Sequence, residues 1–236
     1  MKKTIHVSNQ GATLDTNRRN FLKLSGVGLA MAGLTLIGCD DSDFNFVDSN
    51  VFDLGKGDVG ILNYAYALEQ LEADFYTKVV NNFYSGISSA EKDILTDLYH
   101  HEVIHRDFFK AAISGATSNV LPTLEFQYPG VDFNSRSSVL ATAKALEDTG
   151  VAAYNGAGKY ITNADYLVIA GKIVSVEARH AAAIRDLINP GTAAFSGDDV
   201  VNPTNGLDVA KEPKEVVTAA GGFFKTPFTW KEQGII

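Results

Sequence analysis

The stretch LYHHEVIHRDFF at residues 98–109 decides the fold of this chain. In a helix, Glu102 and His105 fall on one stripe with apolar residues, because the steps between these positions alternate between three and four. The apolar members of the stripe are Leu95, Leu98, Phe109 and Ala112. A carboxylate and an imidazole therefore interrupt a face that would otherwise pack into a core. An unpaired buried carboxylate costs several kcal/mol, so the pattern favours a bound cation.

The same stripe recurs once, with Glu177 and His180 in the central places. Its full set is Ala170, Ile173, Glu177, His180, Ile184 and Leu187. Because Glu-x-x-His appears twice at the same point of an apolar stripe, the two motifs indicate one shared buried site.

A second pair of segments also matches. Each carries Ala-Leu-Glu and then a Tyr seven residues after the Glu, which gives Glu69 with Tyr76 and Glu147 with Tyr154. The chain is thus two copies of a two-helix unit, and each unit supplies one Glu and one Glu-x-x-His. This is the ligand set of a dinuclear carboxylate site inside a four-helix bundle.

Residues 1–38 are typical of an export signal. Arg18 and Arg19 precede an uncharged apolar run at residues 24–38, as in a twin-arginine signal. The run of about fifteen residues is short of the roughly twenty that a transmembrane helix needs. LIGC at residues 36–39 resembles a bacterial lipobox, and Cys39 is the only cysteine in the chain. We expect an exported protein that a lipid on Cys39 anchors to the periplasmic or cell-surface face of a membrane.

The charge balance excludes nucleic acid as a partner. Cleavage before Cys39 removes five of the 20 basic and one of the 28 acidic residues, which leaves 15 basic and 27 acidic residues. A chain this acidic repels a phosphate backbone and gains no attraction to anionic lipid. Residues 39–57 are polar and rich in Asp, which predicts a flexible tether. The sequence is compatible with assembly of the chain into a homo-oligomer.

The expected fold is all-α, with the bundle at residues 58–190. We place its helices at residues 58–83, 89–113, 135–161 and 164–188. Asp58 is the expected N-cap of the first, and Ser88 with Glu91 has capping-box spacing before the second. Residues 114–134 would form the long crossover between the second and third helices. Residues 191–236 are expected to pack on the bundle as an extension, with one short helix at residues 214–220.

These residues justify a family comparison. The two Ala-Leu-Glu segments and the two Glu-x-x-His segments, which cover a little over half of the chain, resemble the ferritin-like superfamily. In particular, the chain is similar to exported bacterial ferritin-like domain proteins related to plant desiccation-associated proteins. By that resemblance, Glu69 and Glu147 are terminal ligands, and Glu102 and Glu177 bridge two metal ions. The resemblance gives His105 and His180 one metal ion each.

The two repeats differ at Glu72, which corresponds to Gly150. Glu72 is either an additional ligand or proton acceptor, or a Glu at the edge of the stripe that reaches solvent. In the first case Gly150 would leave the opposite side of the site open to substrate or oxygen. Tyr76 and Tyr154 either hydrogen-bond the ligands or carry an electron, or they simply fill the core. Glu72, Tyr76 and Tyr154 are therefore the candidate catalytic residues.

Four carboxylates with two imidazoles favour two divalent ions, iron or manganese, over a zinc site of sulfur and nitrogen. One expected function is an oxidoreductase that acts on peroxide or dioxygen, in the manner of a catalase or an oxidase. The alternative is a metal-binding, stress-protective protein without turnover. A remote alternative is a zinc protease, because residues 101–105 read HEVIH. That reading needs His101 and His105 as zinc ligands, whereas the bundle leaves His101 at the surface or behind a ligand and His100 in solvent.

Overall fold

The computed structural model describes residues 51–235. The expected export signal, Cys39 and most of the expected tether lie outside the described residues. The main elements are the helices α2 (Gly57–Asn81), α3 (Ser89–Ala116), α4 (Arg136–Ala157) and α5 (Ala164–Ile188). Within the described part, no helix is both long enough and apolar enough to cross a membrane.

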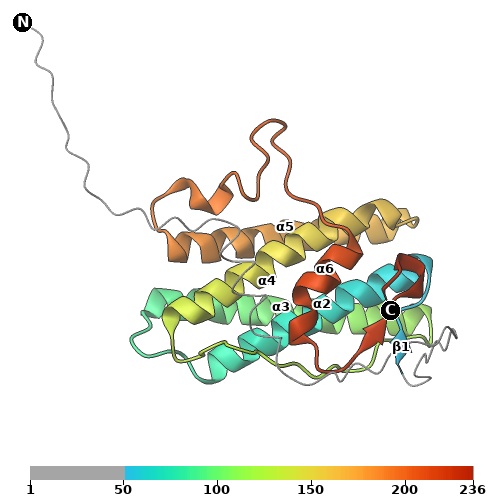
Figure 1. Ribbon diagram of the computed structural model, residues 1–236, viewed down its shortest axis with the longest axis horizontal. Coiled ribbons are helices and arrows are strands. Elements are labelled where there is room, and N and C mark those ends of the chain that lie inside the picture. Colours follow the sequence, from blue (N-terminus) through green and yellow to red (C-terminus); the bar gives the residue numbers. More distant parts are fainter. Residues whose placement is uncertain (1–50, 236) are drawn as a thin grey trace, which may run out of the picture. The chain divides into compact units, whose positions relative to one another are not determined.

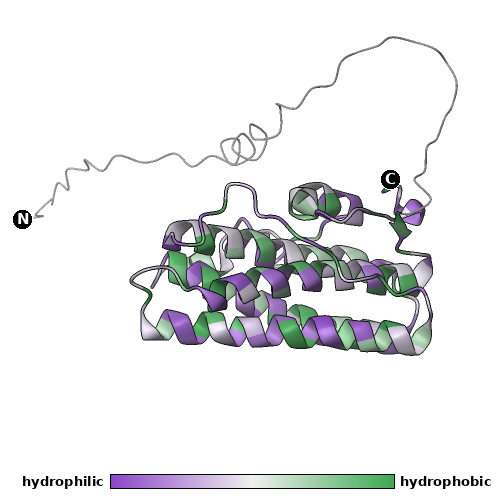
Figure 2. Ribbon diagram, turned by 90° about the horizontal axis from the view of Figure 1, so that it is seen from below, coloured by the Kyte–Doolittle hydropathy of each residue, from purple (hydrophilic) through white to green (hydrophobic). Residues whose placement is uncertain are grey.

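The four long helices form a bundle, which confirms the all-α prediction (Figure 1). Helix α2 packs mainly on α3, and α4 packs mainly on α5. Residues 117–135 connect α3 to α4 along the outside of the bundle. In Figure 2 each long helix carries hydrophobic and hydrophilic residues in alternating patches, as expected when one side of a helix is buried and the other is wet.

The ends of the helices follow their capping residues. Ser88 and Glu91 form the predicted capping box of α3. The prediction for Asp58 is wrong, because Lys56 occupies the N-cap position of α2. The Asp58 carboxylate instead accepts hydrogen bonds from the backbone N–H groups of Thr162 and Asn163, at 2.7 and 3.0 Å. It therefore ties the start of α2 to the turn between α4 and α5.

Helix α4 is shorter than the sequence predicts. It ends at Ala157 and continues as a 3-10 turn, η1 (Gly158–Tyr160). Glycine is a poor helix former, and the regular helix gives way at Gly158. Gly156 has a packing role, since a Cβ there would lie 1.7 Å from the backbone oxygen of Lys211. The C-terminal extension thus lies directly on the α4 backbone.

A layer of buried polar residues divides the core. One apolar cluster lies at the end of the bundle that contains Ile61 and Phe109, and the other lies at the end that contains Phe75 and Leu95. In each long helix the sequence passes from one cluster to the other through a buried Glu. These residues are Glu69, Glu102, Glu147 and Glu177, all with 0 % exposure. The expected site therefore lies in the middle of the bundle.

Two buried amides of α2 hold the crossover against the bundle. The Asn63 side chain donates to the backbone oxygens of Leu54 and Asn119 and accepts from the N–H of Leu121. The Gln70 side chain donates to the oxygen of Pro122 and accepts from the N–H of Leu124. These bonds satisfy backbone groups of a segment that has no regular structure of its own.

Residues 191–235 lie against the bundle through several short elements. The 3-10 turn η2 (Ala193–Ser196) packs on α5, and helix α6 (Pro213–Ala220) packs on α4. Two more 3-10 turns are η3 (Gly221–Phe223) and η4 (Lys231–Gln233). Strand β2 (Phe228–Thr229) pairs in parallel with β1 (Phe52–Asp53).

An ion-pair group around the buried Arg185 fixes the start of the extension. Arg185 of α5 donates to both carboxylate oxygens of Asp148 on α4, each at 2.8 Å. The same guanidinium donates to both oxygens of Asp199, at 3.0 and 2.9 Å. Such paired, planar contacts fix geometry as well as charge, so Arg185 joins α4, α5 and the extension at one point.

Candidate metal centre

The six predicted metal ligands come together in the middle of the bundle. Helix α2 provides Glu69, α3 provides the first Glu-x-x-His, α4 provides Glu147, and α5 provides the second Glu-x-x-His. Their ligand atoms form two groups in which all atoms lie within 4.8 Å of one another. The groups are Glu69, Glu102, His105 and Glu177, and Glu102, Glu147, Glu177 and His180. The two groups thus share Glu102 and Glu177.

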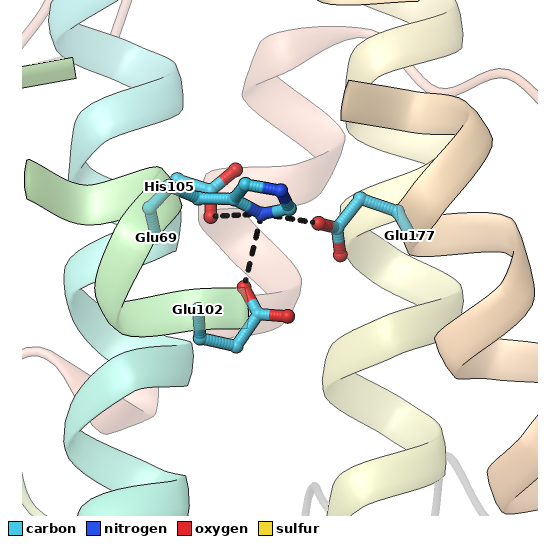
Figure 3. Close-up of side chains that lie close together, drawn as sticks. All are labelled: Glu69, Glu102, His105 and Glu177. Carbon is cyan, nitrogen blue, oxygen red and sulfur yellow. Dashed lines mark ion pairs between the residues drawn. The ribbon is translucent and has the colours of Figure 1, made fainter. Parts of the chain in front are cut away.

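The first group surrounds the Nδ1 atom of His105 (Figure 3). This nitrogen lies 3.0 Å from Oε1 of Glu177, 3.3 Å from Oε2 of Glu69 and 3.6 Å from Oε2 of Glu102. The three carboxylates come from α2, α3 and α5, and all point toward the imidazole. The His105 side chain is 12 % exposed, so this side of the site lies near the bundle surface.

The second group surrounds Nδ1 of His180 in a similar way. This nitrogen lies 2.7 Å from Oε1 of Glu102, 3.5 Å from Oε2 of Glu147 and 3.8 Å from Oε2 of Glu177. Each bridging candidate therefore directs one oxygen to each group. Glu102 directs Oε2 toward His105 and Oε1 toward His180. Glu177 directs Oε1 toward His105 and Oε2 toward His180.

Most of the converging atoms have no hydrogen-bond partner among the described residues. The contacts between the carboxylate oxygens and the Nδ1 atoms of His105 and His180 are close but lack hydrogen-bond geometry. The unpartnered atoms are Oε2 of Glu69, both oxygens of Glu102, Nδ1 of His105, Oε2 of Glu147, both oxygens of Glu177 and Nδ1 of His180. Buried polar atoms are normally paired. Eight such atoms that face a common centre fit cations between them, and this oxygen-rich set suits divalent ions.

Two tyrosines satisfy the outer oxygens of the terminal carboxylates. The Tyr154 hydroxyl donates to Oε1 of Glu69. The Tyr76 hydroxyl donates to Oε1 of Glu147 at 2.5 Å. Each tyrosine lies on the opposite repeat from the carboxylate that it binds, and each leaves Oε2 of that carboxylate facing its group. The tyrosines therefore determine which carboxylate oxygen of Glu69 and Glu147 is left to bind a metal ion.

Burial and mutual contacts set the charges of the metal-free cluster. Burial raises the pKa of Glu69 to about 7 and raises that of Glu177 well above its usual value. Burial would also raise the pKa of Glu102, but its contacts with the two imidazoles outweigh burial and lower it to about 2. Burial lowers the pKa values of His105 and His180, yet their carboxylate contacts raise them to about 12 and 11. Without metal, the imidazoles hold protons where cations would bind.

Comparison with known proteins agrees with this geometry. A family model described as a ferritin-like domain matches residues 57–190. The chain belongs to the ferritin-like domain family. The matched residues contain all four long helices and all six predicted ligands, so the buried cluster lies inside the ferritin-like domain. A comparison with curated proteins gave no match.

The zinc-protease alternative does not fit this ferritin-like domain. His101 lies outside both groups, so His101 and His105 do not form a zincin pair. Its Nδ1 atom lies 2.9 Å from Nε2 of His180, and the two rings stack at 5.1 Å between centroids. His101 therefore orients the candidate ligand His180 from the side of the ring that faces away from the carboxylates. The sequence feature that indicates this position is that His101 directly precedes Glu102. His100 is exposed, as expected.

Glu72 and Gly150 form a matched pair across the bundle, which corrects one expectation. Glu72 is buried, with 3 % exposure, and does not reach solvent. A Cβ on residue 150 would lie 2.9 Å from Oε1 of Glu72 and 3.6 Å from Oε2 of Glu177. Gly150 thus makes room for the Glu72 carboxylate, and the opening that we expected on this side is filled. Glu72 lies beside both groups without belonging to either.

Proposed function

We propose that this ferritin-like protein binds two divalent ions, iron or manganese, and uses them in an oxidation-reduction reaction with peroxide or dioxygen. The observation that carries the proposal is the pair of ligand groups that share Glu102 and Glu177. Two separate mononuclear sites would not need shared carboxylates. Each group also has one imidazole and one terminal carboxylate, so the two positions are nearly equivalent.

The choice of metal rests on the ligand chemistry. The set has four carboxylates and two imidazoles and no thiolate, which suits iron or manganese better than zinc. The four carboxylates and two imidazoles would hold two such ions, which would supply oxidation–reduction chemistry toward a small oxidant. Two divalent charges would also offset the charges of the four carboxylates, which repel one another in the metal-free protein.

The residues around the cluster have separate roles in this proposal. Tyr154 and Tyr76 orient the terminal carboxylates through their hydroxyl groups. His101 fixes the ring of His180 from behind, as outer partners of metal ligands usually do. In the metal-free cluster, burial and the neighbouring carboxylates raise the pKa of Glu72 well above its usual value, so Glu72 holds a proton there, close to Glu177. We assign Glu72 the transfer of protons to the reacting oxygen species.

Metal analysis of the purified full-length chain tests the binding part. Protein produced with iron and manganese available should hold about two equivalents per chain. Glu102→Ala and Glu177→Ala should lose similar amounts of metal, because each residue serves both groups. Glu125→Ala is the matched control, since Glu125 is exposed and, among residues 51–235, forms an ion pair only with Lys225. Wild-type protein that holds no metal, or a single equivalent, contradicts the proposal.

Peroxide and oxygen consumption by the loaded protein test the catalytic part. Glu72→Gln should keep both metal ions and slow the reaction, because the amide cannot transfer the proton. Loaded wild-type protein that consumes neither oxidant would favour the second function, a metal-binding stress-protective protein. That alternative rests on the resemblance to desiccation-associated proteins.

We also propose that the protein is exported and anchored through a lipid on Cys39. The support is in the sequence: the paired arginines, the short apolar run and the lipobox before the single cysteine. An export route for folded proteins would let the bundle take up metal before it crosses the membrane.

A further inference from the structure

An apolar cavity of about 60 Å³ lies at one end of the bundle, and all four long helices contribute to its wall. The wall combines the N-terminal halves of α2 and α5 with the C-terminal halves of α3 and α4. No charged side chain lines the cavity, and almost all of its surface is apolar. The lining residues include Phe108, Ala112, Tyr154 and Ala170.

The two sequence repeats differ in side-chain size at this cavity. Ala112 lines it from α3, and the corresponding residue of the second repeat is Leu187. Ala170 lines it from α5, and the corresponding residue of the first repeat is Leu95. Both leucines pack in the apolar cluster at the opposite end of the bundle. The cavity therefore lies where the chain has alanine in place of the leucine that the other repeat uses.

Tyr154 connects this cavity to the candidate metal centre. Tyr154 lines the cavity, and its hydroxyl donates to Oε1 of Glu69. Leu68, which directly precedes Glu69, also lines the cavity. A single side chain thus separates the cavity from the ligand group that contains Glu69 and His105.

The other sides of the metal centre differ from this one. Tyr76, the counterpart of Tyr154, is fully buried and packs edge-on against Phe75 at 5.2 Å. Glu72 fills the space beside residue 150. His105 is slightly exposed, but a molecule that approaches there meets an imidazole and carboxylates. That approach suits ions and polar molecules, whereas the cavity suits apolar ones.

The cavity also reaches the surface. It is not fully enclosed, and Phe108 both lines it and is 39 % exposed. The Phe108 side chain therefore belongs to the cavity wall and to the outside of α3. A small molecule in solution can enter past this side chain without crossing the polar layer.

The size and lining of the cavity restrict what it can hold. An apolar cavity of about 150 Å³ stays dry and accepts benzene, which has six heavy atoms. In proportion, the present cavity has room for roughly two heavy atoms. Dioxygen is diatomic and apolar. Hydrogen peroxide has the same number of heavy atoms, but a hydrogen-bonding molecule such as water needs about two to four polar partners in a buried site. The apolar wall favours dioxygen.

We propose that this cavity is the entry route and holding site for dioxygen beside the candidate metal centre, and that Ala112 and Ala170 keep it open. Dioxygen enters past Phe108, rests against Tyr154 and reaches the ligand group around His105 from there. Peroxide reaches the same group by the polar approach at His105. That the gas takes part in an oxidation–reduction reaction rests on the proposed function, whereas its binding in the cavity does not.

Xenon tests the cavity without any metal, because apolar cavities of this kind bind it. Crystals of the full-length protein under xenon pressure should show an anomalous xenon peak inside the cavity. Ala112→Leu should remove the peak, whereas Ala111→Leu should keep it, since the neighbouring Ala111 is exposed. Ala112→Val fills less space and replaces the leucine variant if that variant does not fold. No xenon peak in the wild type, or an unchanged peak in the filled variant, would overturn the proposal.

Rapid mixing tests the route. Protein loaded with Fe²⁺ without air is mixed with dissolved oxygen or with hydrogen peroxide, and the oxidation of the iron is followed by absorbance. Ala112→Leu and Ala170→Leu should slow oxidation by dioxygen about tenfold, because the gas would have to cross close-packed side chains. Metal content and oxidation by peroxide should stay at wild-type values, and Ala111→Leu should match the wild type with both oxidants. Wild-type rates with dioxygen in a filled variant, or equal slowing with both oxidants, would refute the route.

The two proposals fail in different ways. Wild-type protein that binds xenon in the cavity but takes up no metal would refute the proposed function alone. Protein that holds two metal ions and reacts with an oxidant, but shows no xenon peak, would refute the cavity assignment alone.

Discussion

Removing the Tyr154 hydroxyl should weaken metal binding without disturbing the bundle. In Tyr154→Phe the ring remains in place, but Oε1 of Glu69 loses its hydrogen-bond donor. A hydrogen bond to a charged group contributes about 1.5 to 3 kcal/mol. This corresponds to a rise of about one to two units in the pKa of Glu69, which is already about 7 because of burial. At neutral pH Glu69 would then be mostly protonated and would have to lose that proton to bind metal.

We therefore expect Tyr154→Phe to lower metal affinity about tenfold to a hundredfold, as is usual for groups that support metal ligands. Competition with a chromophoric chelator at pH 7 measures this affinity. Tyr76→Phe should have a similar effect, because Tyr76 makes the equivalent bond to Glu147.

Tyr128→Phe is the matched control for these variants. The Tyr128 hydroxyl donates to Asp74 at 2.8 Å, and Asp74 belongs to neither ligand group. This change should leave metal affinity unaltered. Wild-type affinity in Tyr154→Phe, or an equal loss in Tyr128→Phe, would refute the role given to the two tyrosines.

Three further predictions concern charge, the extension and the anchor. Metal uptake near pH 7 should release about two or more protons per chain into weakly buffered solution. The reason is that the raised pKa values of His105 and His180 keep both imidazoles protonated without metal. Uptake without proton release would contradict these charge states. Arg185→Met should lower the free energy of unfolding by about 3 kcal/mol. This value is near the lower end for a broken buried ion pair, because Asp199 is half-exposed. Urea denaturation that matches the wild type would show that this ion-pair group contributes nothing to stability. Cys39→Ser should move the protein from the membrane fraction to the soluble exported fraction, since a lipid would be the anchor, and unchanged membrane association would rule out the lipobox.

The repeated pattern was sufficient to predict the bundle and the residues of its cluster. Glu-x-x-His on an apolar stripe has few structural solutions, because a buried carboxylate needs a partner and the period of the helix fixes which residues face inward. Two such stripes and two matching Glu-containing segments then require four helices around one centre. The length of residues 114–134, together with Pro122 and Pro129, predicts the long crossover between the second and third helices of the bundle.

Features that depend on contacts between distant segments were missed or wrong. Asp58 precedes an apolar stripe as an N-cap would, yet its carboxylate binds the turn at Thr162, which no local pattern could reveal. Glu72 and Gly150 were recognised as an asymmetry, but only their positions across the bundle show that one fills the space beside the other. Asn63 and Gln70 gave no signal, because an amide that holds a crossover resembles any polar residue at the edge of a helical stripe.

Anomalous diffraction from crystals of the iron-loaded or manganese-loaded protein would test the central claim most directly. The account predicts two separate metal peaks, one in each ligand group, with Glu102 and Glu177 contacting both. A single peak, or two peaks that share neither carboxylate, would contradict it.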